Sequence, residues 1–118
     1  MQLDFRYDLL RHRYLHYGVR TVAASTTAGA AGESVILVTA AATITLPQAE
    51  SNRGRSFYIK RTGAGAVSVA VLAGDTIDGA AGPVVLAVLP VVPGTNAATA
   101  NAILVVSDGS NWFIIASY

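Results

Sequence analysis

The chain has 118 residues, of which 53% are hydrophobic and 13% are charged, with a formal net charge of +1 and no cysteine. This length suits one domain with a thin core, and the apolar fraction excludes intrinsic disorder. The absence of cysteine excludes disulfides and thiolate metal sites, and the small net charge offers no whole-molecule footprint for nucleic acid or an anionic membrane. So few charges on a small domain indicate that part of its surface is covered by other subunits.

Residues 1–20 form a basic, aromatic arm that differs in composition from the rest. They hold four of the eight Lys and Arg residues, both histidines and three of the five tyrosines. Leu3, Tyr7 and Leu10 follow the a/d spacing of a helix, while Leu3, Phe5 and Tyr7 alternate as in a strand, and both interpretations stay open. Neither form is stable alone at this length, so we expect the arm to dock on another surface.

Two partners fit the composition of the arm. Arginines between aromatic rings suit single-stranded nucleic acid, and the same residue types are enriched where one protein anchors on another. We favour a protein anchor and expect no nucleic-acid partner, because the leucines add more apolar surface than a phosphate-binding arm needs. Only the nucleic-acid interpretation predicts binding that weakens strongly with salt. The expected anchoring residues are Phe5, Tyr7, Leu10, Arg11, Arg13, Tyr14 and Tyr17.

Short β-type runs separated by turn residues follow the arm. We expect a connector over 21–34, which is rich in Ala, Thr and Gly, and a β-module over 35–118. Alternating apolar residues and turn signals predict its strands. The expected strands cover residues 35–39, 43–46, 57–60, 67–71, 84–89, 103–106 and 112–115.

Two of the turns predict β-hairpins. Residues 62–65, Thr-Gly-Ala-Gly, would join strand 57–60 to strand 67–71, and residues 108–111, Asp-Gly-Ser-Asn, would join the last two strands. Strands at intervals of about 8 to 15 residues are typical of antiparallel folds. The predicted fold class is all-β, an antiparallel β-sandwich or barrel-like module.

Residues 84–89 are apolar on both faces of the expected strand. A small domain cannot cover both faces, so we expect packing against a neighbouring subunit. The expected oligomer-interface residues are Val84, Leu86, Val88 and Val91. The whole apolar stretch between Pro83 and Pro93 is too short to span a bilayer, and no apolar signal core follows the N-terminal charges. We therefore expect no membrane partner and no export.

The sequence offers no convincing catalytic or metal site, and we expect no cofactor. Asp75 and Asp78 lie close together, but a calcium loop needs more oxygen ligands, and Asp before Gly is typical of a turn. Asp108 stands in a turn of the same kind. His12 and His16 would share a helical face without an evident third ligand. No Gly-x-Ser-x-Gly elbow is present for nucleophilic catalysis.

A set of turn-and-strand motifs resembles a known family. The motifs are Thr43-Ile44-Thr45-Leu46-Pro47, Asn52-Arg53-Gly54 before Phe57-Tyr58-Ile59-Lys60, Thr62-Gly63-Ala64-Gly65-Ala66-Val67-Ser68-Val69, Gly74-Asp75-Thr76-Ile77-Asp78-Gly79 and Val105-Val106-Ser107-Asp108-Gly109-Ser110-Asn111-Trp112. Together they resemble a small β-module of tailed-bacteriophage virion proteins, which occurs in tail fibres, head fibres and capsid decoration proteins. The resemblance covers residues 35–118 and implies a homotrimer.

The resemblance and the arm together lead us to expect a non-enzymatic viral structural protein of a bacteriophage virion. The chain lacks the long repetitive shaft of tail fibres, which favours a capsid decoration or cement protein on the capsid surface, made in the host cytoplasm. Its arm would bind the major capsid protein or another virion protein.

Two alternatives remain open from the sequence. One is a tail-fibre or baseplate component that binds a host receptor or glycan through residues 75–82 and 93–101. The other is a carbohydrate-binding module, although the few aromatic residues of the β-module lie mostly on expected strands, where core packing accounts for them.

Overall fold

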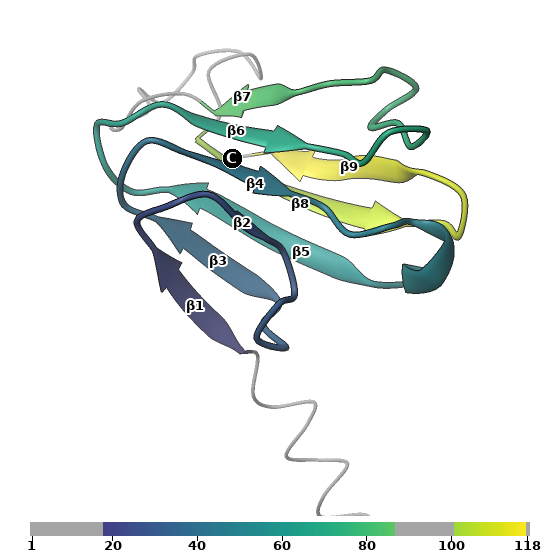
Figure 1. Cartoon of the computed structure of the whole chain (residues 1–118), viewed down its shortest axis with the longest axis horizontal. Helices are drawn as coiled ribbons and strands as arrows, with labels where there is room; N and C mark the ends of the chain where they lie inside the picture. Colours follow the sequence, from purple (N-terminus) through teal and green to yellow (C-terminus); the bar gives the residue numbers. More distant parts are fainter. Residues whose placement is uncertain (1–17, 87–100, 118) are drawn as a thin grey trace, which may run out of the picture.

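A computed structural model describes residues 18–86 and 101–117 of the protein. Two β-sheets pack face to face, as Figure 1 shows. The five-stranded sheet has the strand order β1-β3-β5-β8-β9, and the four-stranded sheet has the order β2-β4-β6-β7. The all-β prediction is therefore confirmed in the form of a sandwich-like pair of sheets. The sheets are not closed into a barrel.

The described residues form nine strands and one short 3-10 helix at Glu50–Asn52. The strands are β1 (Val19–Val22), β2 (Thr26–Thr27), β3 (Val35–Val38), β4 (Ala42–Thr45), β5 (Ser56–Arg61), β6 (Val67–Ala70), β7 (Val84–Leu86), β8 (Ala102–Ser107) and β9 (Trp112–Ser117). Each strand expected from the sequence is present, although β7 is described only as far as Leu86.

The first six strands alternate between the two sheets, so the chain winds as a flattened coil (Figure 1). Successive strands in one sheet are therefore parallel: β1 with β3, β3 with β5, β2 with β4, and β4 with β6. Antiparallel pairing begins later, where β7 pairs with β6, and β8 pairs with β5 and β9. The prediction of an antiparallel fold is wrong for the coiled half of the molecule, and the sheets are mixed.

The hairpin predicted at residues 62–65 is also wrong, because β5 and β6 belong to different sheets. Residues 62–65 instead carry the chain from one sheet to the other. A side chain on Gly63 would collide with the backbone of Thr39, and one on Gly65 would collide with the backbone of Ala41. The glycines are required because this corner of the coil stacks directly on the previous corner.

The hairpin predicted near the C-terminus is confirmed by the antiparallel pairing of β8 and β9. Its turn is held by Asp108, whose carboxylate accepts hydrogen bonds from the backbone N–H groups of Ser110 at 2.8 Å and Asn111 at 2.9 Å. This is the local Asx geometry that favours Asp at turns. The ladder shifts register between Leu104 and Val105, which makes a bulge at Ile115.

The connector expected over residues 21–34 contributes to the sandwich. Half of β1 and the whole of β2 lie within it, and β1 pairs with β3 along its full length. Arg20, which was assigned to the arm, is a residue of β1. The alanine-rich pieces at 23–24 and 28–31 form bends and turns.

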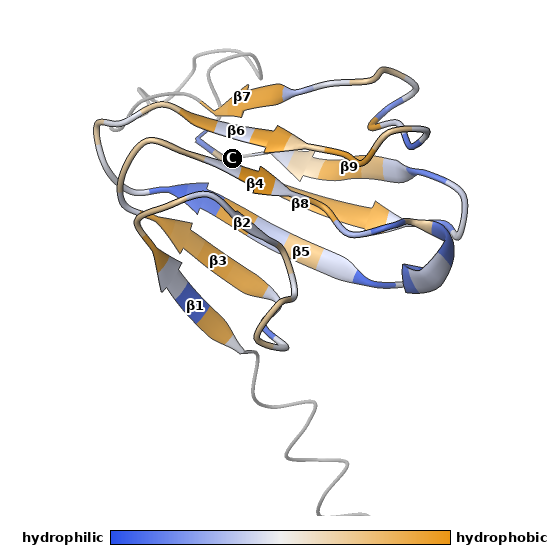
Figure 2. Cartoon of the chain, viewed as in Figure 1, coloured by the Kyte–Doolittle hydropathy of each residue, from blue (hydrophilic) through white to orange (hydrophobic). Residues whose placement is uncertain are grey.

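The core lies between the sheets and follows the strand alternation. Ile36, Ile44, Ile59 and Val69 are fully buried, and Figure 2 shows the hydrophobic residues gathered along the strands. Its largest member is Trp112, whose ring lies 5.8 Å from that of Phe57. Burial of these side chains supplies the main stabilisation of the sandwich. Within the described part of the chain, no helix is long and apolar enough to cross a membrane.

Candidate functional site

The expected anchoring residues lie outside the described residues. They are Phe5, Tyr7, Leu10, Arg11, Arg13, Tyr14 and Tyr17. His12 and His16 lie outside them as well, and so do Val88 and Val91 of the expected oligomer interface. Their roles stay predictions.

Strand β7 places the other two expected interface residues inside the sandwich. Leu86 is 1% exposed and belongs to the core, and Val84 packs against the same core. Val85 between them points away and is 61% exposed. The burial assigns Leu86 to the core of its own chain, so Val85 is the residue of this strand that a neighbour can reach.

The outer face is the side of the five-stranded sheet that points away from the core. It carries a continuous row of apolar residues. The ladder pairs Val19 with Val35, Val35 with Tyr58, Tyr58 with Leu104, and Leu104 with Ala116. This apolar row therefore crosses all five strands. Val19 is 60% exposed and Tyr58 40% exposed, so the row is open to solvent at its edge and its centre.

Two further rows flank the apolar row. Val106 pairs with Ser56 on one side and with Phe113 on the other, and Phe113 is 38% exposed. On the other flank Leu37 pairs with Lys60, whose ammonium group donates to Asn101 Oδ1 at 3.4 Å. The outer face is thus apolar over most of its described area.

The outward-facing side of the four-stranded sheet has a different character. Thr43 pairs with Ser68, and Thr45 pairs with Ala70, so hydroxyl groups and a small side chain line this surface. Val85 at its edge is the exposed large hydrophobic residue of the strands in this sheet. An apolar surface is therefore concentrated on one side of the sandwich.

The free edge of β9 is partly covered by residues 76–78. The backbone N–H of Trp112 donates to Thr76 O at 2.9 Å, and the backbone N–H of Asp78 donates to Trp112 O at 3.0 Å. The Asp78 carboxylate then accepts from the backbone N–H of Ile114 at 3.0 Å. Exposed strand edges pair readily with other chains, so this cover limits edge pairing at Trp112 and Ile114.

The loop around Asp75 is tied to two distant turns. The Asp75 carboxylate accepts from the backbone N–H of Ala49 at 3.0 Å, and Asn111 Oδ1 accepts from the backbone N–H of Thr76 at 2.9 Å. Trp112 completes the cluster, since its indole N–H donates to Pro47 O at 3.0 Å. These bonds join residues 47–49, 75–78 and 111–114 into one corner of the molecule.

A second polar cluster centres on Glu33, which is 2% exposed. Its carboxylate accepts from the backbone N–H groups of Gly29 at 2.7 Å and Ala31 at 3.0 Å, and it pairs with Arg20 at 3.5 Å. Burial by itself raises the pKa of Glu33, but hydrogen bonds from backbone N–H groups and the charge of Arg20 outweigh it, so the pKa is lowered. The cluster closes the turn that joins β2 to β3.

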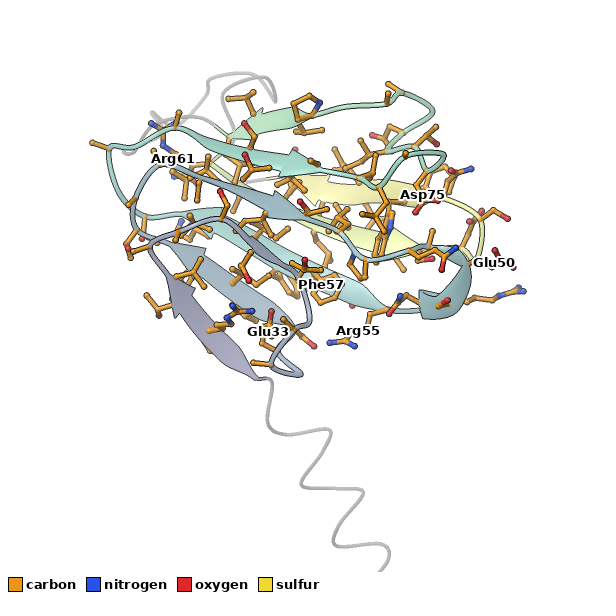
Figure 3. The ribbon with its side chains drawn as sticks, in the orientation of Figure 1. Glu33, Glu50, Arg55, Phe57, Arg61 and Asp75 are labelled. Carbon is orange, nitrogen blue, oxygen red and sulfur yellow. The ribbon has the colours of Figure 1, made fainter. Side chains whose placement is uncertain are left out.

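Two arginines stabilise opposite ends of β5, as Figure 3 shows. Arg55 donates to Glu33 O at 2.8 Å and lies 4.7 Å from the centre of the Phe57 ring. Arg61 is 5% exposed and donates to the backbone carbonyls of Gly63, Ala64 and Leu86 at 3.3, 2.6 and 2.8 Å. Arg61 thereby ties β5 to the end of β7 in the other sheet.

Four of the five carboxylates of the described residues hold the backbone. Glu33, Asp75, Asp78 and Asp108 each accept backbone N–H groups. Hydrogen bonds from Asn111 and Ser110 lower the pKa of Asp108. Among residues 18–86 and 101–117, no group of three or more His, Asp or Glu side chains is arranged to hold a metal ion.

No family model, curated protein or solved structure matches this chain. Function is therefore inferred from the geometry above and from the motifs of the sequence.

The sequence reasoning did not identify the outer face. Val35, Leu37, Leu104 and Val106 lie on strands that are apolar on both faces, which is the signal that predicts an interface at residues 84–89. Applied to β3 and β8 as well, it would have indicated this surface.

Proposed function

We propose that this chain is a non-enzymatic structural protein of a bacteriophage virion, namely a capsid decoration protein that binds the assembled shell through residues 1–17 and acts as a homotrimer. One observation carries the proposal. Four of the five carboxylates of the described residues hold the protein's own backbone, and one sheet face is apolar and open to its surroundings. Such a surface serves assembly, since large exposed apolar patches mark sites of association.

The positions of the motifs support the same proposal. Pro47, Asp75, Asp78, Asn111 and Trp112 belong to three separate motifs of the phage-module resemblance, and hydrogen bonds join all three in one corner of the sandwich. Because these motifs bind one another in the fold, a sequence that forms this corner needs all three of them. The resemblance is thus tied to the architecture of the module, and the binding function is left to the arm and the outer face.

The proposed mechanism is mechanical. A ligand that binds only the assembled shell adds its binding free energy to that state and opposes expansion or rupture. A trimer that presents three arms gains further from effective concentration once the first arm is bound. Arginine and tyrosine suit such an anchor because they dominate the binding energy of protein interfaces.

The experiment is a co-sedimentation assay with capsids assembled without this chain. The double variant Arg13→Ala, Tyr14→Ala should lose capsid occupancy while it keeps the fold and mass of the unaltered protein. Arg53→Ala is the matched control, because Arg53 is an exposed arginine of the sandwich. Unchanged occupancy of the double variant would refute the anchor. Binding to tails or host cells in place of heads would favour the adhesin alternative.

A further inference from the structure

The outer face of the five-stranded sheet lacks a covering layer within the described residues. A sheet normally buries one face on the core and presents polar side chains on the other. Here the four-stranded sheet follows that rule with Thr43, Thr45 and Ser68, whereas the five-stranded sheet presents the apolar row from Val19 to Ala116. The two outward-facing sides of one sandwich therefore differ in chemistry.

The chemistry of the outer face favours a like surface as its occupant. In the three cross-strand rows described above, the outer face carries one charged residue, Lys60. Its ammonium group already donates to Asn101. A surface with so little charge has no electrostatic means to select a foreign partner of opposite charge. Interfaces between identical subunits are the more apolar class, and Tyr and Phe are enriched in interfaces.

The size of the face also suits a subunit interface. Five strands about 4.8 Å apart span about 19 Å; at about 3.3 Å per residue, β5, β8 and β9 are about 20 Å long and the shorter β1 and β3 about 13 Å, which gives roughly 330 Å² in projection. The accessible surface of a face with side chains exceeds its projection. Two copies that meet here remove on the order of 1,000 Å², the size at which specific interfaces begin.

Two of the exposed large hydrophobic residues of the five-stranded sheet, Phe113 and Ile115, lie on β9. Asp78 covers the edge of β9 only as far as Ile114, and Ile115 beyond it is 59% exposed. Phe113, Ile115 and Tyr58 are all exposed large hydrophobics of this sheet. The bulge at Ile115 places an extra apolar side chain beside the apolar row.

We propose that the outer face of the five-stranded sheet packs against the neighbouring copies of this chain around the axis of a trimer, with the contact centred on β5, β8 and β9. The inference deepens the homotrimer proposed above by naming the surface that each copy contributes. Its test needs no capsid, so failure of the interface and failure of capsid binding are separate results.

The test compares two matched glutamate substitutions in the full chain by light scattering coupled to size exclusion. Ile115→Glu alters a 59% exposed residue at the edge of the outer face, and Val85→Glu alters a 61% exposed residue at the edge of the other sheet. The unaltered protein and Val85→Glu should have the mass of three chains, and Ile115→Glu should have the mass of one chain with its circular dichroism spectrum unchanged. Tyr58→Glu should act like Ile115→Glu, and it decides the test if Ile115→Glu does not fold.

A second measurement uses spin labels on introduced cysteines, which are specific because the chain has no cysteine of its own. Ser56→Cys places one spin label on the outer face, and Ser68→Cys places one on the opposite side of the sandwich. Label at position 56 should show dipolar broadening between copies, and label at position 68 should show less. A monomeric unaltered protein, or an oligomer that Val85→Glu dissociates and Ile115→Glu does not, would overturn the proposal. A monomer whose outer face is shielded by its own N-terminal residues or by a foreign protein would overturn it equally.

Discussion

The Asp78 carboxylate accepts a hydrogen bond from the backbone N–H of Ile114 at 3.0 Å, across a separation of 36 residues. Asp78 has a φ of 51°, the left-handed region that Asp and Asn tolerate better than most residues. The unusual backbone aims this side chain at the edge of β9. One residue therefore shapes a turn and covers a strand edge.

Asp78→Ala should lower the free energy of unfolding by about 1–2 kcal/mol, because it removes this hydrogen bond and puts a side chain without a local acceptor in the left-handed region. Urea denaturation measures the loss. Asp78→Asn is the control, since asparagine keeps an acceptor oxygen and tolerates the same φ. Equal stability of the Ala and Asn variants would show that the edge does not need this acceptor.

Glu33 should make folding stability depend on pH in the acid range. Its pKa is lowered in the folded state, so its contribution is complete above the unfolded value of about 4.3 and is lost as pH falls through the folded value. Glu33→Gln should cost about 1–3 kcal/mol at pH 7, because a neutral amide cannot accept all the N–H groups that the carboxylate accepts.

The difference between the unaltered protein and Glu33→Gln should be constant from pH 6 to 8 and shrink below about pH 4. Urea denaturation at a series of pH values measures it. Asp108, whose pKa is also lowered, is present in both proteins and cancels in the comparison. A difference that grows as the pH falls would contradict the assignment.

Gly63→Ala should destabilise the fold by about 1–3 kcal/mol or more, since the added methyl group meets the backbone of Thr39 in the adjacent coil. Ala64→Ser, at the exposed residue beside it, should change the melting temperature little. If Gly63→Ala melts with the unaltered protein, the two corners do not stack as described.

The sequence predicts the strands from β3 onward and the C-terminal hairpin, whereas it does not predict β1, β2 or the winding of the chain between the two sheets. Alternation in residues such as Phe57 and Ile59 shows which side chains are buried, and this holds for parallel and antiparallel neighbours alike. Gly63 and Gly65 suit a hairpin turn as well as a tightly stacked corner. The winding of the chain between two sheets is decided by packing between residues that lie about 24 apart, such as Thr39 and Gly63.

The candidate site was predictable only in part, for a related reason. Residues 84–89 are apolar throughout, but the short strand β7 buries Leu86 and exposes Val85, a choice made by its pairing with β6. The outer face needs the ladder from Val19 to Ala116 before its residues become neighbours. The sequence shows which strands are apolar on both faces, but its spacing does not show which of these strands are neighbours.

Capsid occupancy tests the central claim most directly. The full chain and a chain that begins at Gly18 are each mixed with capsids assembled without this protein and sedimented at low and high salt. The cut at residue 17 keeps Gly18, whose carbonyl accepts from the backbone N–H groups of Ser34 and Val35, and thus keeps β1. We predict that the full chain binds heads at both salt concentrations and that the shorter chain binds at neither. Equal binding of the two chains, or binding that high salt abolishes, would contradict a protein-anchored decoration role.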